Sequence, residues 1–198
     1  MIANSKGGVE KTTLASNVAD YFASRGHAVM LGDGDRQGSS PLWLGFWPPT
    51  AQPISSWDVG DINLVKPPRC TTPVVLDTPG VMHGRRLGAV VKLADKIMLP
   101  LQPSVFDIFA TRLFLDQLAE YRRMGKVQVD TVDTLVNARN TAADLLQAFV
   151  ARLGFPARGR VRDTQNHIRL AARELSLFDV AQNRVEKIWC NGMRFVAG

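Results

Sequence analysis

A glycine-rich segment near the beginning of the chain constrains its fold more than any other feature. It runs from Ser5 to Thr13 with the sequence SKGGVEKTT, between a short apolar segment at 1–4 and a helix-like segment at 11–24. A strand, a glycine-rich turn and a Lys-Thr pair that opens a helix together form a cradle for phosphate groups, because backbone N–H groups and the helix N-terminus supply positive potential. In such a cradle Lys11 is expected to reach the terminal phosphates and Thr12 to ligate Mg²⁺.

Strand-like and helix-like segments alternate along most of the chain. The strand-like runs lie at 28–32, 74–76, 96–99 and 132–136, and apolar residues recur at helical spacing in 11–24, 105–123, 142–153 and 169–175. This alternation predicts an α/β fold with three layers, a doubly wound and mostly parallel sheet with helices on both faces. The proline-containing segment 48–73 predicts a looser surface connection, with 62–65 as a candidate edge strand. We expect one domain over 1–198, since this length fits a single core.

Acidic residues follow two of the strand-like runs directly. Asp33 and Asp35 come after the run at 28–32, and Asp77 comes after the run at 74–76. Because the carboxyl ends of parallel strands meet at one edge of a sheet, these side chains are expected to converge near the glycine-rich loop. Hard cations prefer oxygen ligands, so Thr12, Asp33 and Asp77 are the predicted metal-binding set.

The composition is that of an ordinary globular chain with a basic excess. Lys and Arg number 24 against 18 Asp and Glu, which gives a net charge of +6. This excess fits a polyanionic partner such as DNA or an acidic membrane surface, and it fits a solvated Arg-rich surface equally well. Cys70 and Cys190 have no spacing typical of metal sites or disulfide frameworks. No segment approaches the roughly 18 apolar residues of a membrane span.

The loop resembles the deviant Walker A motif KGGxGK[ST]T of the ParA/MinD superfamily of P-loop ATPases. Residues 6–13 match this motif at every position except Glu10. Four further segments resemble the family's motifs in the same order along the chain: 31–39 its first switch, 74–80 its Walker B strand and second switch, 99–104 its PxxPS stretch, and 162–179 its late IRD region. The resemblance is to the small ParA-like partition and positioning ATPases, which implies a SIMIBI-type P-loop NTPase fold.

The resemblance also implies a function and a set of site residues. It implies ATP and Mg²⁺ as cofactors, and a homodimer that forms on ATP binding. Lys6 would reach the partner's phosphates, Lys11 would stabilise the transferred phosphate, and Asp35 would position the attacking water. The implied nucleotide contacts are Lys6, Gly7, Gly8, Val9, Glu10, Lys11, Thr12 and Thr13 in the loop, with Asn137 and Arg139 near the base.

Relatives of this kind position cargo inside the cell. The resemblance implies that the ATP-bound dimer binds DNA non-specifically, is cytoplasmic and nucleoid-associated, and segregates a plasmid, a chromosome or a protein cargo. A partner protein would stimulate hydrolysis. The basic residues expected to contact DNA phosphates are Arg158, Arg160, Arg162, Arg169 and Arg173, and such contacts would be salt-dependent.

Several features depart from the family pattern. Glu10 replaces a glycine and brings a carboxylate beside the phosphates, which predicts weakened nucleotide affinity. A nucleotide-binding scaffold with weak or no hydrolysis is therefore one alternative function. A MinD-like membrane-associated ATPase is another, although 188–198 lacks the periodicity of a membrane-binding helix and is expected to form an atypical tail.

Two departures concern the sheet. Segment 1–4 is shorter than a complete first strand, so the first strand is expected to be truncated. Asp130 and Asp133 interrupt the run at 127–136, where a strand buried on both faces should be continuously apolar.

Overall fold

The computed structural model describes most of the chain. The described residues are 1–35, 39–47, 49, 51–59, 73–80, 82, 84–102, 105–123, 127–136, 141–152, 154–155, 157–162, 170, 178 and 189–190. The elements are α1 (Lys11–Ala23), β1 (Val29–Asp33), α2 (Ser39–Leu44), β2 (Ile54–Asp58), β3 (Val74–Asp77), α3 (Gly84–Val91), β4 (Lys96–Leu101), α4 (Val105–Arg123), β5 (Gln128–Val136), α5 (Thr141–Arg152), β6 (Ala157–Arg162) and β7 (Trp189–Cys190).

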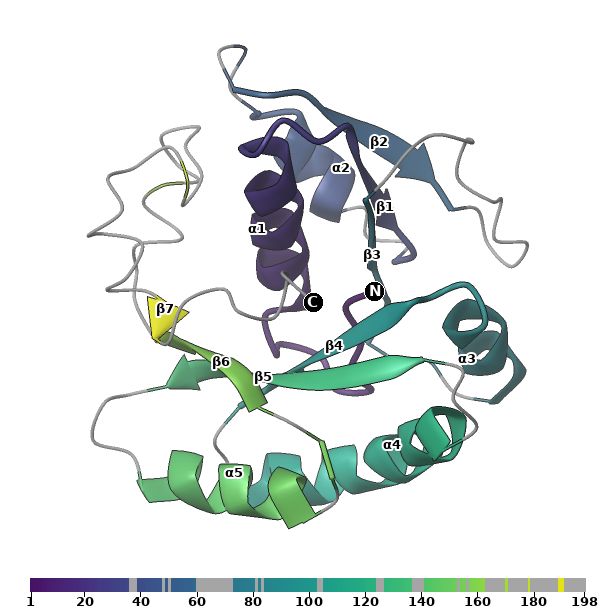
Figure 1. Ribbon diagram of the computed structural model, residues 1–198, viewed down its shortest axis with the longest axis vertical. Helices are drawn as coiled ribbons and strands as arrows, with labels where there is room; N and C mark the ends of the chain where they lie inside the picture. The colour runs from purple at the N-terminus through teal and green to yellow at the C-terminus, as the bar shows by residue number, and fades with distance from the viewer. Residues whose placement is uncertain are drawn as a thin grey trace.

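The segment 1–3 joins two groups of strands into one sheet. The groups have the orders β2-β1-β3 and β4-β5-β6-β7, and every pairing is parallel except that of β6 with β7. Ile2 lies between the groups, in parallel bridges with Asp77 of β3 and Met98 of β4. The backbone N–H of Ile2 donates to the Leu76 carbonyl at 2.8 Å, and that of Ala3 donates to the Met98 carbonyl at 3.1 Å. The predicted α/β sheet is therefore confirmed, and the glycine-rich loop emerges from its centre (Figure 1).

Successive residues of the central strands face two separate cores. Ile2, Val75 and Met98 pack in one buried cluster with α1, whereas their chain neighbours Ala3, Leu76 and Leu99 pack in another with α3, α4 and α5. Alternation of this kind follows from the two-residue period of a strand. Figure 1 shows the result: α1 lies on one side of the sheet, with α4 and α5 on the other. The predicted three-layer arrangement is confirmed.

The segment 48–73 contains a strand that its proline content did not predict. This strand, β2, pairs with β1 in register from Val29 and Ile54 onward. The pairing places Trp57 opposite Gly32, and a Cβ on Gly32 would lie 2.5 Å from the Trp57 ring. A glycine in β1 is thus what lets the indole pack across the strand. The candidate edge strand at 62–65 lies outside the described residues.

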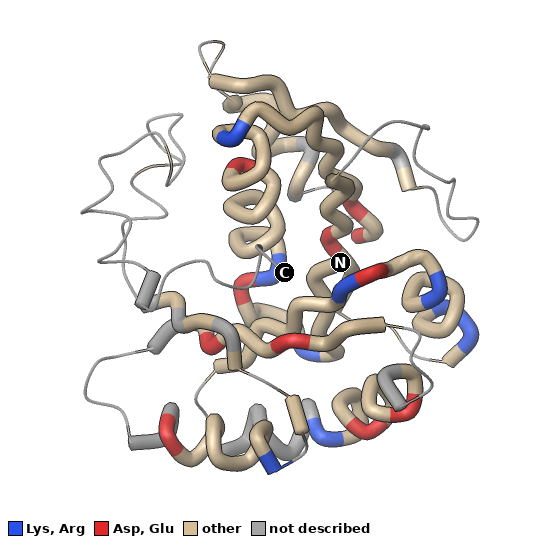
Figure 2. The backbone as a smooth tube through the Cα atoms, in the orientation of Figure 1, with Lys and Arg blue, Asp and Glu red and all other residues tan. Residues whose placement is uncertain are grey.

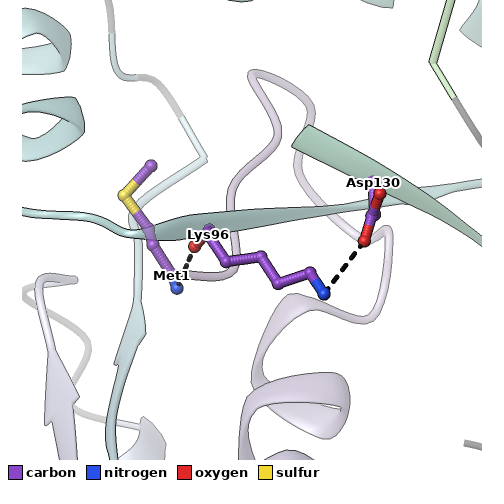
Figure 3. Close-up of polar contacts among 3 residues, drawn as sticks. All are labelled: Met1, Lys96 and Asp130. Carbon is purple, nitrogen blue, oxygen red and sulfur yellow. Dashed lines mark hydrogen bonds and ion pairs between the residues drawn. The ribbon is translucent and has the colours of Figure 1, made fainter. Parts of the chain in front are cut away.

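β5 buries two acidic residues, Asp130 and Asp133, although a strand buried on both faces was expected to be continuously apolar, and its pairing with β6 has register shifts beside them. β5 begins at Gln128, earlier than the predicted 132, and both carboxylates are fully buried. Lys96 lies 3.2 Å from Asp130 on the neighbouring strand (Figure 3). Gln147 of α5 donates to Asp133 at 2.9 Å. Each buried carboxylate thus has a polar partner on an adjacent element, which lowers the cost of its burial.

Other predicted and observed elements differ in smaller ways. The predicted helices at 105–123 and 142–153 correspond to α4 and α5, while α2, α3 and β6 were not predicted. Most of the predicted helix at 169–175 lies outside the described residues. Within the part of the chain that the structure describes, no helix has the length and apolar character needed to cross a membrane.

Candidate nucleotide-binding site

Side chains from three neighbouring strands hold the backbone of the glycine-rich loop. Asn4 donates to the Pro100 carbonyl at 2.7 Å and accepts the backbone N–H of Lys6 at 2.9 Å. Gln102, just past β4, donates to the Gly8 carbonyl at 2.6 Å. Thr134 of β5 lies 3.4 Å from the Val9 carbonyl. These bonds occupy the Gly8 and Val9 carbonyls and hold the loop against the carboxyl ends of the neighbouring strands.

These anchoring residues were not predicted from the sequence. Asn4 directly precedes the loop, so its position was a usable signal. Gln102 lies in the segment 99–104, whose resemblance to a family motif was a usable signal, whereas Thr134 carries none, because only the sheet order brings β5 beside the loop.

Lys11, the first residue of α1, lies at the centre of the site. Its ammonium group donates to the Lys6 carbonyl at 2.7 Å, which folds the loop over it. Burial lowers the pKa of Lys11 from its ordinary value, and the nearby Asp77 and Asp35 carboxylates act in the opposite direction. Gly80 approaches from the segment after β3, where an added Cβ would lie 3.8 Å from the Lys11 ammonium nitrogen. The predicted loop and the end of the Walker B segment therefore meet.

Asp77 is the most constrained acidic residue of the site. Only 2% of the residue is exposed, and its Oδ2 accepts the Thr12 hydroxyl at 2.7 Å and the Ser40 hydroxyl at 3.1 Å. Its Oδ1 is buried and has no hydrogen-bond partner among the described residues. Burial is the largest cause that raises the pKa of Asp77, to about 6, with the Asp33 charge acting in the same direction.

This arrangement fits a Mg²⁺ ion beside bound phosphates. A buried carboxylate oxygen without a partner, next to a threonine hydroxyl, offers the hard oxygen ligands that Mg²⁺ prefers. The described residues contain no group of three His, Cys, Asp or Glu that could hold a metal by themselves. A site with one carboxylate and one hydroxyl is consistent with a cation that takes its other ligands from water and phosphate.

Asp33 is occupied by backbone groups of the segment that follows it. One carboxylate oxygen accepts the N–H of Asp35 at 2.8 Å, and the other accepts the N–H of Ser40 at 2.8 Å. These bonds shape the turn between β1 and α2 and hold Asp35 close to the site. Ser40, which is fully buried and was not predicted, contacts both Asp33 and Asp77 and so ties α2 to the candidate metal site.

Glu10 adopts a backbone conformation that explains why the motif prefers glycine there. Its φ is 63° and its ψ 33°, and it is the one non-glycine residue with positive φ in the described part of the chain. This left-handed conformation costs an ordinary residue about 1–2 kcal/mol. The Glu10 carbonyl still accepts the Leu14 N–H at 2.9 Å, so α1 begins normally.

Some predicted site residues are not placed by the structure. Asn137, Arg139, Arg169 and Arg173 lie outside the described residues. Arg158, Arg160 and Arg162 belong to β6, of which only the backbone is described at those positions. Among the described elements, α3 carries two basic residues, Arg85 and Arg86, and no acidic residue (Figure 2). The DNA-binding surface therefore stays a prediction.

Comparison with family models agrees with this geometry. The nucleotide-binding domain model of CobQ, CobB, MinD and ParA matches residues 1–178. The chain belongs to the CobQ/CobB/MinD/ParA family. The match covers the loop, both acidic turns and the whole parallel part of the sheet.

Two similar members of this family carry the name "Maintenance of carboxysome distribution protein A". The one from Gloeobacter kilaueensis is 37% identical over 120 residues, which are 54% of this chain and 50% of that protein. The one from Halothiobacillus neapolitanus is 27% identical over 163 residues, 78% of this chain and 74% of that protein. The match thus spans half the length of the first relative.

Solved structures of family members have the same fold. The MinD cell division protein of Aquifex aeolicus superposes with a TM-score of 0.71 at 19% identity, over 94% of this chain and 89% of that chain. An ATP complex of a Cyanothece McdA variant gives 0.70 at 13% identity, over 94% and 91%. The septum site-determining protein MinD of Pyrococcus horikoshii, in complex with Mg-ADP, gives 0.69 at 13% identity, over 94% and 90%.

Proposed function

We propose that this chain is a Mg²⁺-dependent, ATP-binding positioning protein of the ParA kind. The observation that carries the proposal is the buried Asp77 carboxylate, which contacts Thr12 and lies close to Lys11 while one of its oxygens has no partner among the described residues. The names of the two similar proteins support a role in distributing cargo in the cell. The nucleotide-bound forms of structural relatives support ATP and Mg²⁺ as the ligands.

The proposed roles follow from position. Lys11 would neutralise the terminal phosphates, Thr12 and Asp77 would hold Mg²⁺, and Asp33 would support the metal's water shell. Bound Mg²⁺ supplies charge neutralisation on the phosphate oxygens. Asp35, which the Asp33 carboxylate holds by its N–H, would orient the attacking water.

The remaining parts of the proposal concern assembly. One domain over 1–198 would form a homodimer on ATP binding, with Lys6 reaching the partner's phosphates. Asn137 and Arg139 would contact the base. The dimer would bind DNA through the basic residues of the late segment, and a partner protein would stimulate hydrolysis and release it. Such a protein would work in the cytoplasm, at the nucleoid when ATP is bound.

Direct measurement of nucleotide binding and turnover tests this proposal. Mg-ATP and Mg-ADP affinity and ATP turnover would be measured with and without DNA, in the natural chain, in Lys11→Gln and in Lys92→Gln. Lys92 is exposed beyond α3, so its variant is the matched control for loss of one charge. Lys11→Gln should weaken nucleotide binding about a hundredfold, since it removes a charge-assisted contact to phosphate in a partly buried site. Equal binding by all three proteins contradicts the proposed site.

A second candidate function is a nucleotide-binding scaffold that does not hydrolyse ATP. The observation in its favour is Glu10, which places a carboxylate and a strained backbone at the start of α1. Turnover by the natural chain beside Glu10→Gly separates the two functions. Binding without turnover in the natural chain, with turnover restored in Glu10→Gly, supports the scaffold; equal turnover in both excludes it.

A further inference from the structure

Glu10 and Thr13 form a hydrogen-bonded pair at the first turn of α1. The Thr13 hydroxyl donates to Oε2 of Glu10 at 2.7 Å, and both residues are half-buried. Glu10 is the position at which this chain departs from the loop motif of its family. Whether glutamate at residue 10 prevents the loop from binding phosphate therefore depends on which group its carboxylate contacts.

The Glu10 carboxylate does not cap the helix that it begins. A residue at this position usually turns a side-chain oxygen toward the backbone N–H groups of the first turn. The backbone of Glu10 has the left-handed conformation, and its side chain makes no hydrogen bond to these N–H groups. The N–H groups at the start of α1 are thus not capped by Glu10, and these groups are the ones that bind an anion at a helix N-terminus.

A carboxylate tethered at residue 10 would otherwise compete with phosphate. The positive end of a helix attracts any nearby anion, and a covalently attached one is present at high effective concentration. The hydrogen bond from Thr13 gives the carboxylate a different partner, a side-chain hydroxyl one turn along the helix. A bond of this kind to a charged group is favourable enough to bias the carboxylate's position.

We propose that Thr13 is a positioning residue that holds the Glu10 carboxylate away from the phosphate-binding turn. With this pair formed, a loop that carries glutamate at residue 10 can still bind nucleotide. The inference rests on the proposed nucleotide-binding function. It predicts that a hydroxyl at residue 13 matters far more when residue 10 is glutamate than when it is glycine.

A double-mutant cycle tests this prediction. A fluorescent ADP analogue in excess Mg²⁺ would be titrated into four proteins: the natural chain, Thr13→Val, Glu10→Gly and the double variant. Circular dichroism would first show that each of them is folded. Thr13→Val should weaken binding about fivefold more in the natural background than in the Glu10→Gly background, a difference the size of one hydrogen bond, whatever direct contact Thr13 makes with the nucleotide in both. Thr13→Ser keeps the hydroxyl and should therefore show little of the difference between the two backgrounds that Thr13→Val shows.

The alternatives give different results. Equal weakening by Thr13→Val in both backgrounds means that Thr13 acts on the nucleotide alone and overturns the inference. Tighter binding by Thr13→Val in the natural background means that the pair obstructs the nucleotide, and also overturns it. If none of the four folded proteins binds nucleotide, the proposed function fails and this inference fails with it.

Discussion

Replacing Asp77 by asparagine should stabilise the metal-free protein while removing its response to Mg²⁺-nucleotide. Asp77 is almost completely buried, and one of its carboxylate oxygens has no partner among the described residues. An asparagine side chain has nearly the same shape. Its carbonyl oxygen can still accept the hydroxyls of Thr12 and Ser40, but it carries no charge.

The magnitude follows from the raised pKa of Asp77. The difference between about 6 in the folded protein and the ordinary 3.8 corresponds to about 3 kcal/mol at neutral pH. The folded state binds more protons than the unfolded state between these values, so the free energy of unfolding falls as pH rises through this range. The amide NH2 of asparagine would take the place of Oδ1, which has no hydrogen-bond partner among the described residues, and leaving the NH2 unpaired costs about 1 kcal/mol. We therefore expect a net gain of about 2 kcal/mol above pH 6.

Urea unfolding without nucleotide or divalent cations measures this gain. The natural chain and Asp77→Asn would be compared at several pH values. The variant should be about 2 kcal/mol more stable above about pH 6 and about 1 kcal/mol less stable below about pH 4, where Asp77 is protonated in both states and only the cost of the unpaired amide remains. Saturating Mg-ATP should then stabilise the natural chain by about 2.7 kcal/mol at a hundredfold excess over Kd, and leave the variant almost unchanged.

Two results would refute this reasoning. If Asp77→Asn is no more stable than the natural chain near neutral pH, burial of the charge does not cost what its raised pKa implies. If the difference between the two proteins is the same at pH 4 and pH 7, it does not arise from the ionisation of Asp77.

Three further substitutions test the fold and the loop. Gly32→Ala should lower the free energy of unfolding by about 2 kcal/mol in chemical denaturation, because its methyl group would lie 2.5 Å from the Trp57 ring. Gly7→Ala is its control and should change the free energy of unfolding much less, because a Cβ at Gly7 has no neighbour within 4 Å. Gln102→Leu should weaken Mg-ADP binding about fivefold in calorimetry without changing the melting temperature, because it removes the hydrogen bond to the Gly8 carbonyl. Gln117→Leu on the exposed side of α4 is the control, and equal Mg-ADP affinities of the two variants would contradict the anchoring role of Gln102. Lys96→Met should cost about 3 kcal/mol by removing the charge beside buried Asp130, and Asp130→Asn in the same chain should restore most of it; no restoration would mean that the pair is not coupled.

The sequence predicted the fold and the centre of the site because both depend on local patterns. Apolar runs that end in Asp33 and Asp77 were enough to place these carboxylates at one edge of the sheet. The loop motif placed Lys11 and Thr12, which lie where the pattern predicts.

The residues that sequence reasoning missed depend on contacts between distant segments. Ser40 and Thr134 act only because α2 and β5 meet at the loop, and no local pattern distinguishes them from other polar residues. The segment 99–104 drew attention to Gln102, but it did not show that this side chain holds Gly8. The buried Asp130 was misjudged for the same reason, since its partner Lys96 lies on another strand. The sequence showed that Glu10 is unusual, but only the structure shows that Thr13 binds its carboxylate.

The placement of residues 1–3 between β3 and β4 has a consequence for the order in which this protein acquires its structure. The backbone amine of Met1 contacts Lys96, which lies 95 positions further along the chain. Segments 74–77 and 96–101 must both be available before this piece can pair on its two sides. The phosphate-binding loop follows it directly, so we expect the loop to become competent only after residues 1–3 have paired with β3 and β4. A chain in which these strands have not yet paired would then hold no nucleotide, and ligand binding would report that the two halves of the sheet have joined.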